Sequence, residues 1–132
     1  MHQFKVAKLV RDKIAQRMIA DEKAKYRVLK QTGFIKELKK KIFEEAKELG
    51  SIKEKKKIIK ELVDLQEIID TLSQTLKSSK KEIKDKQRKE NKKSGSFKKR
   101  LYIENIELSD DHQWLDYYLA NSKKYPEVKK TK

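Results

Sequence analysis

Residues 43–64 read FEEAKELGSIKEKKKIIKELVD and hold two pairs of acidic side chains at matching spacing. Glu45 and Glu48 are three residues apart, and so are Glu61 and Asp64. On an α-helix, residues three apart lie on one face with Cβ atoms about 5–6 Å apart, so each pair can direct both carboxylates to one point. All-oxygen ligation suits Mg²⁺ or Mn²⁺ rather than zinc. Two interpretations follow: a metal site, or solvated acidic faces on Lys/Glu-rich helices.

The apolar residues around these pairs predict two long helices that pack along a seam. At 100° per residue, Glu45 and Glu61 each fall roughly 60° from the centre of their helix's apolar stripe. Carboxylates brought together at such a seam repel each other unless a cation lies between them. The stripes consist of Ile35, Leu38, Ile42, Ala46 and Leu49 in the first helix, and of Ile58, Leu62, Leu65, Ile69, Leu72 and Leu76 in the second.

Capping signals predict where the chain turns between these helices. Gly50 is expected to end the first helix as its C′ residue, and Ser51 with Glu54 has the S-x-x-E pattern of a capping box. A tight turn at residues 50–51 would leave the acidic pairs about five residues, or ~7 Å, out of register. The connection is therefore expected to be looser than the capping box suggests, or the helices to cross at an angle.

Shorter elements flank the helical pair. Periodicity predicts a helix over 8–20, an extended stretch over 26–29, and Thr32 as the N-cap of the first long helix. Residues 100–108 are β-prone, and Ser109 is expected to cap a last short helix that holds Trp114, Leu115, Tyr118 and Leu119. The fold class predicted is all-α, with at most a short β element near the termini.

Composition narrows the class of protein. The 132 residues are 43% charged and 36% apolar, which favours one modest helical domain. Ile59, Val63 and Ile68 widen the apolar face of the second long helix, so we expect an oligomer, which a strictly monomeric mass in solution would contradict. The chain has no Cys and no stretch of ~20 apolar residues, so we expect a cytoplasmic protein without a membrane span.

The formal net charge of +15 points to a polyanionic partner or to a Lys-rich composition without function. Residues 77–100 carry twelve Lys or Arg against three acids. An alternative function is therefore a basic helical nucleic-acid-binding module, in which the acidic pairs are only solvated faces. The sequence contains neither a phosphate-binding G-x-x-x-x-G-K-[ST] loop nor a G-x-S-x-G elbow.

The ordered motifs resemble those of a known family. EE at 44–45, Glu48, and E-x-x-D at 61–64 resemble the EExxE–ExxD signature of the MazG-like superfamily of all-α NTP pyrophosphatases. The resemblance covers roughly residues 6–104 and is greatest to a small subgroup described as phosphoribosyl-ATP pyrophosphohydrolase-like. It is carried by KLVRDKI (8–14), YRVL (26–29), FIKELKKKIFEEAKEL (34–49), KELVDLQEIID (60–70) and SGSFKKRLYIE (94–104).

The resemblance implies a fold, an activity and a site. The fold would be an antiparallel helical hairpin within a four-helix-bundle-type homodimer or homotetramer. The activity would be Mg²⁺-dependent cleavage of a nucleoside triphosphate between the α and β phosphates, in the clearance of aberrant nucleotides. Glu45, Glu48, Glu61 and Asp64 would bind Mg²⁺, or Mn²⁺ in its place, and Glu44 with Glu45 are the catalytic candidates.

Basic residues are assigned to the triphosphate because Lys and Arg bind phosphate. They are Lys8, Arg11 and Lys13 near the N-terminus, and Lys93, Lys99 and Arg100 around the SGS loop. Residues 1–104 would form the catalytic domain and 105–132 a C-terminal extension. The chain departs from the subgroup at Ala15, where Pro is common, and at Gly95-Ser96, where Gly-Gly is common. A catalytically silent relative that only assembles with partners is a third interpretation.

Overall fold

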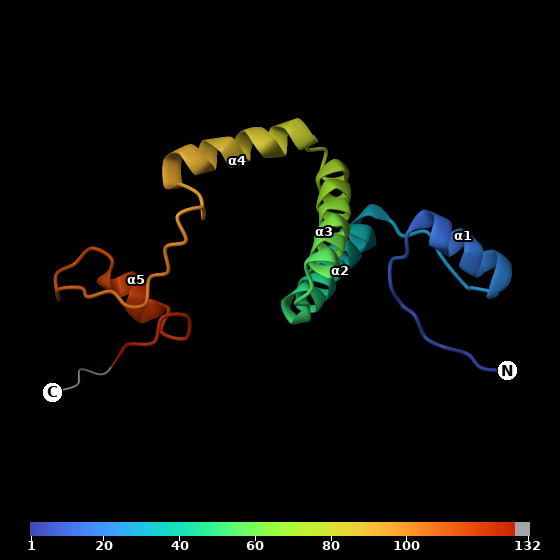
Figure 1. Ribbon diagram of the computed structural model, residues 1–132, viewed down its shortest axis with the longest axis horizontal. Coiled ribbons are helices and arrows are strands. Elements are labelled where there is room, and N and C mark those ends of the chain that lie inside the picture. The colour runs from blue at the N-terminus through green and yellow to red at the C-terminus, as the bar shows by residue number, and fades with distance from the viewer. Residues whose placement is uncertain (129–132) are drawn as a thin grey trace. The chain divides into compact units, whose positions relative to one another are not determined.

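A computed structural model describes residues 1–128 and contains helices but no strand within that range (Figure 1). In chain order the helices are α1 (Asp12–Asp21), α2 (Gln31–Ser51), α3 (Lys55–Thr75), α4 (Lys80–Ser94) and α5 (Leu115–Ala120). The predicted all-α class is confirmed. The chain divides into two compact units, Met1–Ser94 and a second that begins at Gly95, while the catalytic-domain boundary at residue 104 stays a prediction.

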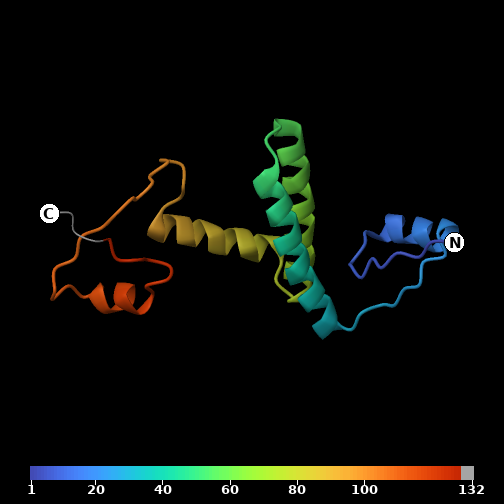
Figure 2. The same ribbon diagram turned by 90° about the horizontal axis from the view of Figure 1, so that it is seen from below.

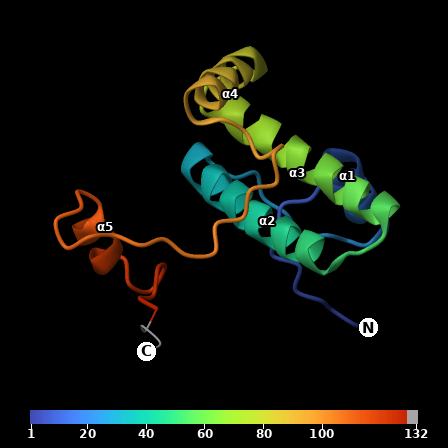
Figure 3. The same cartoon turned by 60° about the vertical axis from the view of Figure 1, so that its left-hand side comes forward.

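The first unit is organised by the α2–α3 hairpin. The two helices run antiparallel and lie side by side in every view (Figures 2 and 3). Each contains 21 residues, so each is about 30 Å long. Leu38 of α2 and Ile68 of α3 are the buried apolar residues, with 4% and 8% of their surface exposed. The hairpin thus has a narrow core and positions its other side chains mainly through helix geometry.

The connection between α2 and α3 lies later in the chain than the capping signals predict. Gly50 and Ser51 are helical, and the three residues Ile52–Glu54 form the turn. The predicted capping box is wrong, because the Ser51 hydroxyl donates to the Glu48 carbonyl (2.9 Å) instead of capping α3. A turn centred on Lys53 places Glu45 and Glu61 eight residues to either side. The register conflict seen in the sequence therefore disappears.

Two other predicted caps are also wrong. Helix α2 begins at Gln31 and not after Thr32, and the Gln31 side chain donates to the carbonyl of Thr75 (3.5 Å) on α3. Helix α5 begins at Leu115, six residues after Ser109, with the Trp114 amide donating to His112 Nδ1 (3.0 Å). A side-chain cap requires a non-helical backbone at the capping residue, which Thr32 lacks.

Two segments differ from the elements predicted for them. Residues 100–108 form no strand, because a β-prone segment needs a neighbouring strand to pair with and the described residues contain none. Helix α1 begins at Asp12, so residues 8–11, which were expected within it, lie in the preceding non-helical segment. The segment over 26–29 forms neither a helix nor a strand, and its predicted extended character stays a prediction.

Helix α3 exposes much of its apolar surface within the single chain. Ile68, predicted to widen that surface, is instead buried in the hairpin. The predicted oligomer, which this surface suggested, stays a prediction. The apolar residues of α3 that are 41–59% exposed are Ile59, Leu62, Val63 and Ile69, and Leu76, directly after the helix, is 58% exposed.

Among residues 1–128, no helix combines the length and the apolar character that crossing a membrane requires.

The position of Gly50 inside α2 gives a test of the observed turn. Its φ is not positive and a Cβ there would meet no atom within 4 Å, so Gly50→Ala should raise the free energy of unfolding by about 0.5–1 kcal/mol. Urea titration followed by circular dichroism measures this. Ala46→Gly, one turn earlier at an exposed position, should lower it by a similar amount. If Gly50→Ala lowered the free energy of unfolding instead, the turn would lie at residues 50–51, as the capping signals predict.

Candidate metal centre

Three carboxylates converge where α2 and α3 pack. Glu45 comes from α2, and Glu61 and Asp64 come from one face of α3. One oxygen of each lies within 4.8 Å of one oxygen of the other two. The three-residue spacing brings Glu61 and Asp64 together, and the turn at 52–54 brings Glu45 opposite them. We refer to Glu45, Glu61 and Asp64 as the carboxylate trio.

The trio is held in an electrostatically unfavourable state. The Glu45 side chain is only 12% exposed. Burial raises the pKa of Glu45, a hydrogen bond with Glu61 raises it further, and the negative charges of Glu61 and Asp64 add to the effect against the opposing charge of Lys41.

One oxygen of the trio lacks a partner. Glu61 Oε2 is buried and makes no hydrogen bond within the described residues. A buried acceptor without a donor destabilises the fold by about 1–3 kcal/mol, more if it is charged. Either a shared proton or a bound cation would satisfy it. An acidic cluster alone is common on protein surfaces, and the buried, unpartnered oxygen of Glu61 is the feature that sets this one apart.

Basic side chains supply part of the missing positive charge. Arg11 Nη2 donates to Asp64 Oδ1 (2.8 Å), and Lys41 Nζ lies 3.9 Å from Glu45 Oε1. Next to the trio, Lys8 Nζ donates to Glu44 Oε1 (2.9 Å). That hydrogen bond is the main cause of the lowered pKa of Glu44 and of the raised pKa of Lys8.

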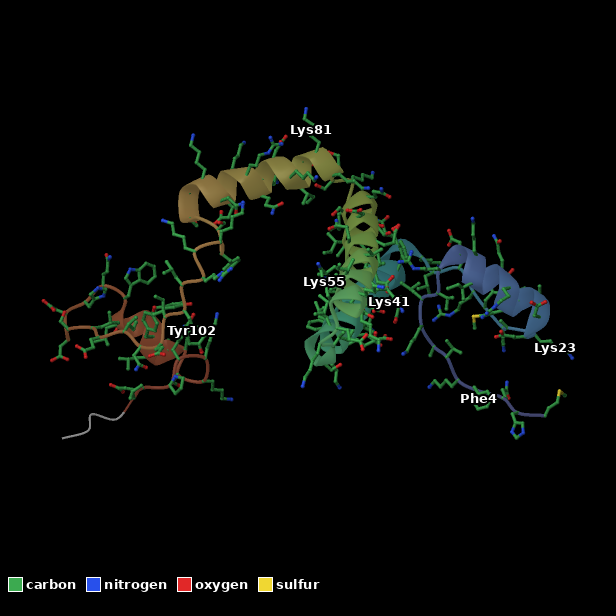
Figure 4. All side chains as sticks on the ribbon, in the orientation of Figure 1. Phe4, Lys23, Lys41, Lys55, Lys81 and Tyr102 are labelled. Atoms are coloured by element: carbon green, nitrogen blue, oxygen red, sulfur yellow. The ribbon has the colours of Figure 1, made fainter. Side chains whose placement is uncertain are left out.

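An open cleft of about 300 Å³ lies beside these ion pairs. The segment before α1 and the start of α1 form one wall, and α2 with α3 form the other. Lys41 of α2, which is labelled in Figure 4, is one of the residues that line it. The cleft combines apolar walls with charged groups of both signs. Its lining consists of Val6, Lys8, Leu9, Val10, Arg11, Ile14, Lys41, Glu45, Asp64, Glu67 and Ile68.

The structure brings together some of the predicted site residues. Of the four expected metal ligands, Glu45, Glu61 and Asp64 form the trio, while Glu48 is exposed and outside it. Glu44, a predicted catalytic residue, is paired with Lys8. Whether Glu48 binds a metal stays a prediction.

The predicted phosphate-binding residues are divided. Lys8 and Arg11 line the cleft, whereas Lys13 is exposed on α1 and does not. Lys93 lies at the end of α4, and Lys99 and Arg100 belong to the second unit. Within residues 1–128, none of these last three makes an ion pair with the trio. Their assignment to phosphate therefore also stays a prediction.

Sequence reasoning did not single out Lys41, which pairs with Glu45. The spacing contained the signal, because Lys41 and Glu45 are four residues apart on one helix and such pairs face each other. Glu67, which lines the cleft one turn after Asp64, was also missed. Its three-residue spacing from Asp64 repeats the pattern of the acidic pairs.

The donor set fits a hard divalent cation. Three carboxylates, one with an unpartnered buried oxygen, match the all-oxygen ligation that Mg²⁺ and Mn²⁺ take in proteins. Their positions on two helices joined by a short turn make the spacing resistant to distortion. Comparison of the chain with protein-family models, with curated proteins and with solved structures finds no match. Any function must therefore be argued from this site.

The raised pKa of Glu45 predicts how stability depends on pH when no divalent cation is added. The folded chain binds the proton of Glu45 more tightly than the unfolded chain does. This stabilising contribution is therefore fully present below pH 4.5, the ordinary pKa of the group, and is lost as the pH rises through the raised pKa of the folded state. Glu45→Gln keeps a neutral side chain at every pH. It should raise the thermal midpoint by about 3 °C at pH 8 and by little near pH 4.

Differential scanning calorimetry in the presence of a chelator measures this effect. Glu44→Gln is the matched control, because the pKa of Glu44 is lowered by Lys8 and its loss should leave the midpoint at pH 8 unchanged or lower. A gain for Glu45→Gln that is equal at both pH values would contradict the electrostatic account of the trio.

Proposed function

We propose that this chain is a Mg²⁺-dependent nucleoside triphosphate pyrophosphohydrolase that cleaves between the α and β phosphates. The observation that carries the proposal is the carboxylate trio with its unpartnered Glu61 oxygen. It is supported by the cleft beside the trio, which places Arg11 and Lys8 within reach of a polyanionic substrate. The order of motifs along the chain, described above, is the second line of support.

Hydrolysis adds one water across the anhydride. The oxygen of the water bonds to the phosphorus under attack, the bridging P–O bond breaks, and pyrophosphate and a monophosphate leave. The proton of the water needs an acceptor, and the carboxylate of Glu45, which lines the cleft, would take it. A bound Mg²⁺ supplies positive charge against the phosphate oxygens and lowers the pKa of water.

In this proposal Arg11 and Lys8 pair with carboxylates in the free protein and bind phosphate when the substrate is present. In the structure they pair with Asp64 and Glu44 through side chains that are more than half exposed. Exposed ion pairs contribute only about 0–1 kcal/mol, so both cations can exchange carboxylate for phosphate at little cost. Arg11 is the stronger phosphate ligand because its guanidinium group binds two oxygens at once.

A homodimer or homotetramer is part of the same proposal. The exposed apolar residues of α3 would be covered by a second copy, which would complete a bundle of at least four helices around the two hairpins. Clearance of aberrant nucleotides in the cytoplasm is the role this activity would serve.

Pyrophosphate release from a panel of normal, deoxy and damaged triphosphates, with and without Mg²⁺, tests the activity. Asp64→Asn and Glu61→Gln should each lower kcat/KM by about 100-fold or more, because each removes a charge that the site needs. Asp70→Asn, on the same helix but paired with Lys80, is the matched control and should change it by less than about 2-fold.

Glu48→Gln in the same assay decides whether the fourth predicted ligand takes part. A loss comparable to that of Asp64→Asn would assign Glu48 to the working site. The proposal fails if no triphosphate and no phosphoribosyl nucleotide releases pyrophosphate in a Mg²⁺-dependent reaction.

Arg11→Gln should have opposite effects on metal and nucleotide. Because Arg11 occupies an oxygen of Asp64, its removal should tighten Mn²⁺ binding by about 2- to 5-fold, the equivalent of up to 1 kcal/mol. The same variant should weaken binding of the triphosphate.

Electron paramagnetic resonance of free Mn²⁺ measures metal binding, and titration calorimetry with a nucleotide measures triphosphate binding. Arg17→Gln, which breaks the Arg17–Glu22 pair, is the control and should alter neither; weaker Mn²⁺ binding by Arg11→Gln would refute the exchange.

A further inference from the structure

Helix α4 differs from the other helices in having almost no apolar residue. Its 15 residues, KKEIKDKQRKENKKS, include eight basic and three acidic residues, and Ile83 is the single large apolar one. No residue of α4 is buried. Among the described helices it packs against α3 alone. Such a composition leaves the helix without the apolar face from which most helices gain their stability.

One side of α4 faces α3. Lys80, Ile83, Lys84 and Gln87 line a cleft of about 450 Å³ together with residues of α3. Lys80 Nζ lies 3.2 Å from Asp70 Oδ2 across it. The neighbouring Lys84 adds a smaller favourable charge at Asp70, whose pKa is lowered chiefly by its hydrogen bond with Gln66. This side of α4 is therefore engaged within the chain.

The other side of α4 carries unpaired lysines. At 100° per residue, Lys81, Lys89, Lys92 and Lys93 fall within about 120° of the helix circumference, away from the side that lines the cleft. They span about 18 Å along the axis. Within residues 1–128 none of the four makes an ion pair, and Lys81 extends outward from α4 in Figure 4. We call these four residues the outer lysine face.

The outer lysine face is electrostatically unfavourable in the isolated chain. Like charges three or four residues apart repel, and a helix of 15 residues is marginal in water even without that repulsion. The Glu82–Lys86 and Asp85–Arg88 pairs offset some of it. A partner with closely spaced negative charges would relieve the rest. The positive charge of the outer lysine face therefore favours a polyanionic partner.

A nucleic acid fits this surface better than a membrane does. A helix that binds at a membrane interface buries a broad apolar side, and the only apolar residue of α4 faces α3. Phosphates of a nucleic acid need only the cations. Directly after α4 in the chain, Phe97 and Tyr102 are 100% and 85% exposed and flank Lys98, Lys99 and Arg100. Exposed aromatic rings beside cations are the means by which proteins stack unpaired bases.

We propose that this chain binds single-stranded nucleic acid, a function separate from the hydrolase site, through two stretches that follow one another in the sequence, α4 in the first unit and residues 95–103 in the second. The outer lysine face binds backbone phosphates, and, in the second unit, Phe97 and Tyr102 stack on bases. Lys93, which the sequence assigned to the triphosphate, belongs to this surface. Sequence is not read, because the surface offers charge and ring faces but no set of side chains arranged to recognise base edges.

Fluorescence anisotropy of the full chain with labelled 20-nucleotide oligo(dT) and oligo(U) tests this proposal from 50 to 200 mM salt. The triple variant Lys81→Gln, Lys89→Gln, Lys92→Gln should reduce the slope of log K against log salt by about 2, since each phosphate contact contributes about 0.7. Lys55→Gln, Lys56→Gln, Lys57→Gln changes the net charge equally on exposed positions of α3. It should leave the slope within about 0.5 of the original.

Equal loss in both triple variants would mean that the net charge of +15 binds nucleic acid without a defined surface, and would overturn the proposal. Phe97→Ala and Tyr102→Ala should each weaken binding by about 5-fold or more without changing the salt slope. Duplex DNA bound as tightly as oligo(dT), with no effect of Phe97→Ala, would overturn the single-strand assignment. Tighter binding to vesicles containing 30% phosphatidylserine would identify a membrane surface instead.

The two proposals fail separately in these assays. Asp64→Asn should lower kcat/KM for pyrophosphate release by about 100-fold or more and leave oligonucleotide binding unchanged. The α4 triple variant should weaken oligonucleotide binding and leave pyrophosphate release unchanged, and far-UV circular dichroism equal to that of the parent chain establishes that it is folded.

Discussion

The half-buried carboxylates between α2 and α3 are the constraint on which the first unit depends. Glu45, Glu61 and Asp64 lie where two antiparallel helices must pack, and the negative charges of Glu61 and Asp64 raise the pKa of Glu45 beyond the effect of its burial. Leu38 and Ile68 are the only apolar side chains that the described residues bury, so apolar burial offers little reserve against this repulsion. Whatever carries positive charge to the trio therefore contributes to folding.

Three basic side chains from two parts of the chain supply positive charge to the trio and to the neighbouring Glu44. Lys41 reaches Glu45 along α2, and Arg11 and Lys8 arrive from the segment before α1. That segment has no backbone hydrogen bonds to α2 or α3, so its ion pairs and the apolar lining of the cleft are what hold it there. A divalent cation at the trio would replace the charge of Arg11 and leave the guanidinium group available for a phosphate.

Much of this arrangement could be predicted from the sequence, and the rest depended on the turn. The spacing of apolar residues around Leu38 predicted the first long helix, and the spacing around Leu65 predicted the second, because apolar residues that recur every three or four positions are typical of an amphipathic helix. The capping pattern at Ser51 did not hold, because a hydroxyl near a helix end can bond the carbonyl three residues earlier as readily as an amide ahead. The carboxylate register was the better indicator of the turn, because it conflicted with a tight turn at residues 50–51, and the turn lies at Ile52–Glu54.

Contacts between distant segments were harder to predict. The pairing of Arg11 with Asp64 spans 53 residues, and no local pattern encodes it. Phosphate binding was assigned to basic residues by type alone, and the structure separates them into two groups with different surroundings. Lys8 and Arg11 face carboxylates, whereas Lys93 lies on a helix whose outer side is cationic.

Under the two proposals, that separation would let one chain treat two kinds of phosphate differently. The trio would repel any polyanion until a divalent cation offset its charge, so a triphosphate would enter the cleft only together with its metal. The outer lysine face would have no such requirement, because Lys81, Lys89 and Lys92 make no ion pair within residues 1–128. A long single strand would therefore gain most from α4, where many weak phosphate contacts add up, and would gain little from a cleft of about 300 Å³. A compact triphosphate carrying Mg²⁺ would have the opposite preference, since its charge is concentrated and its metal would need the carboxylates.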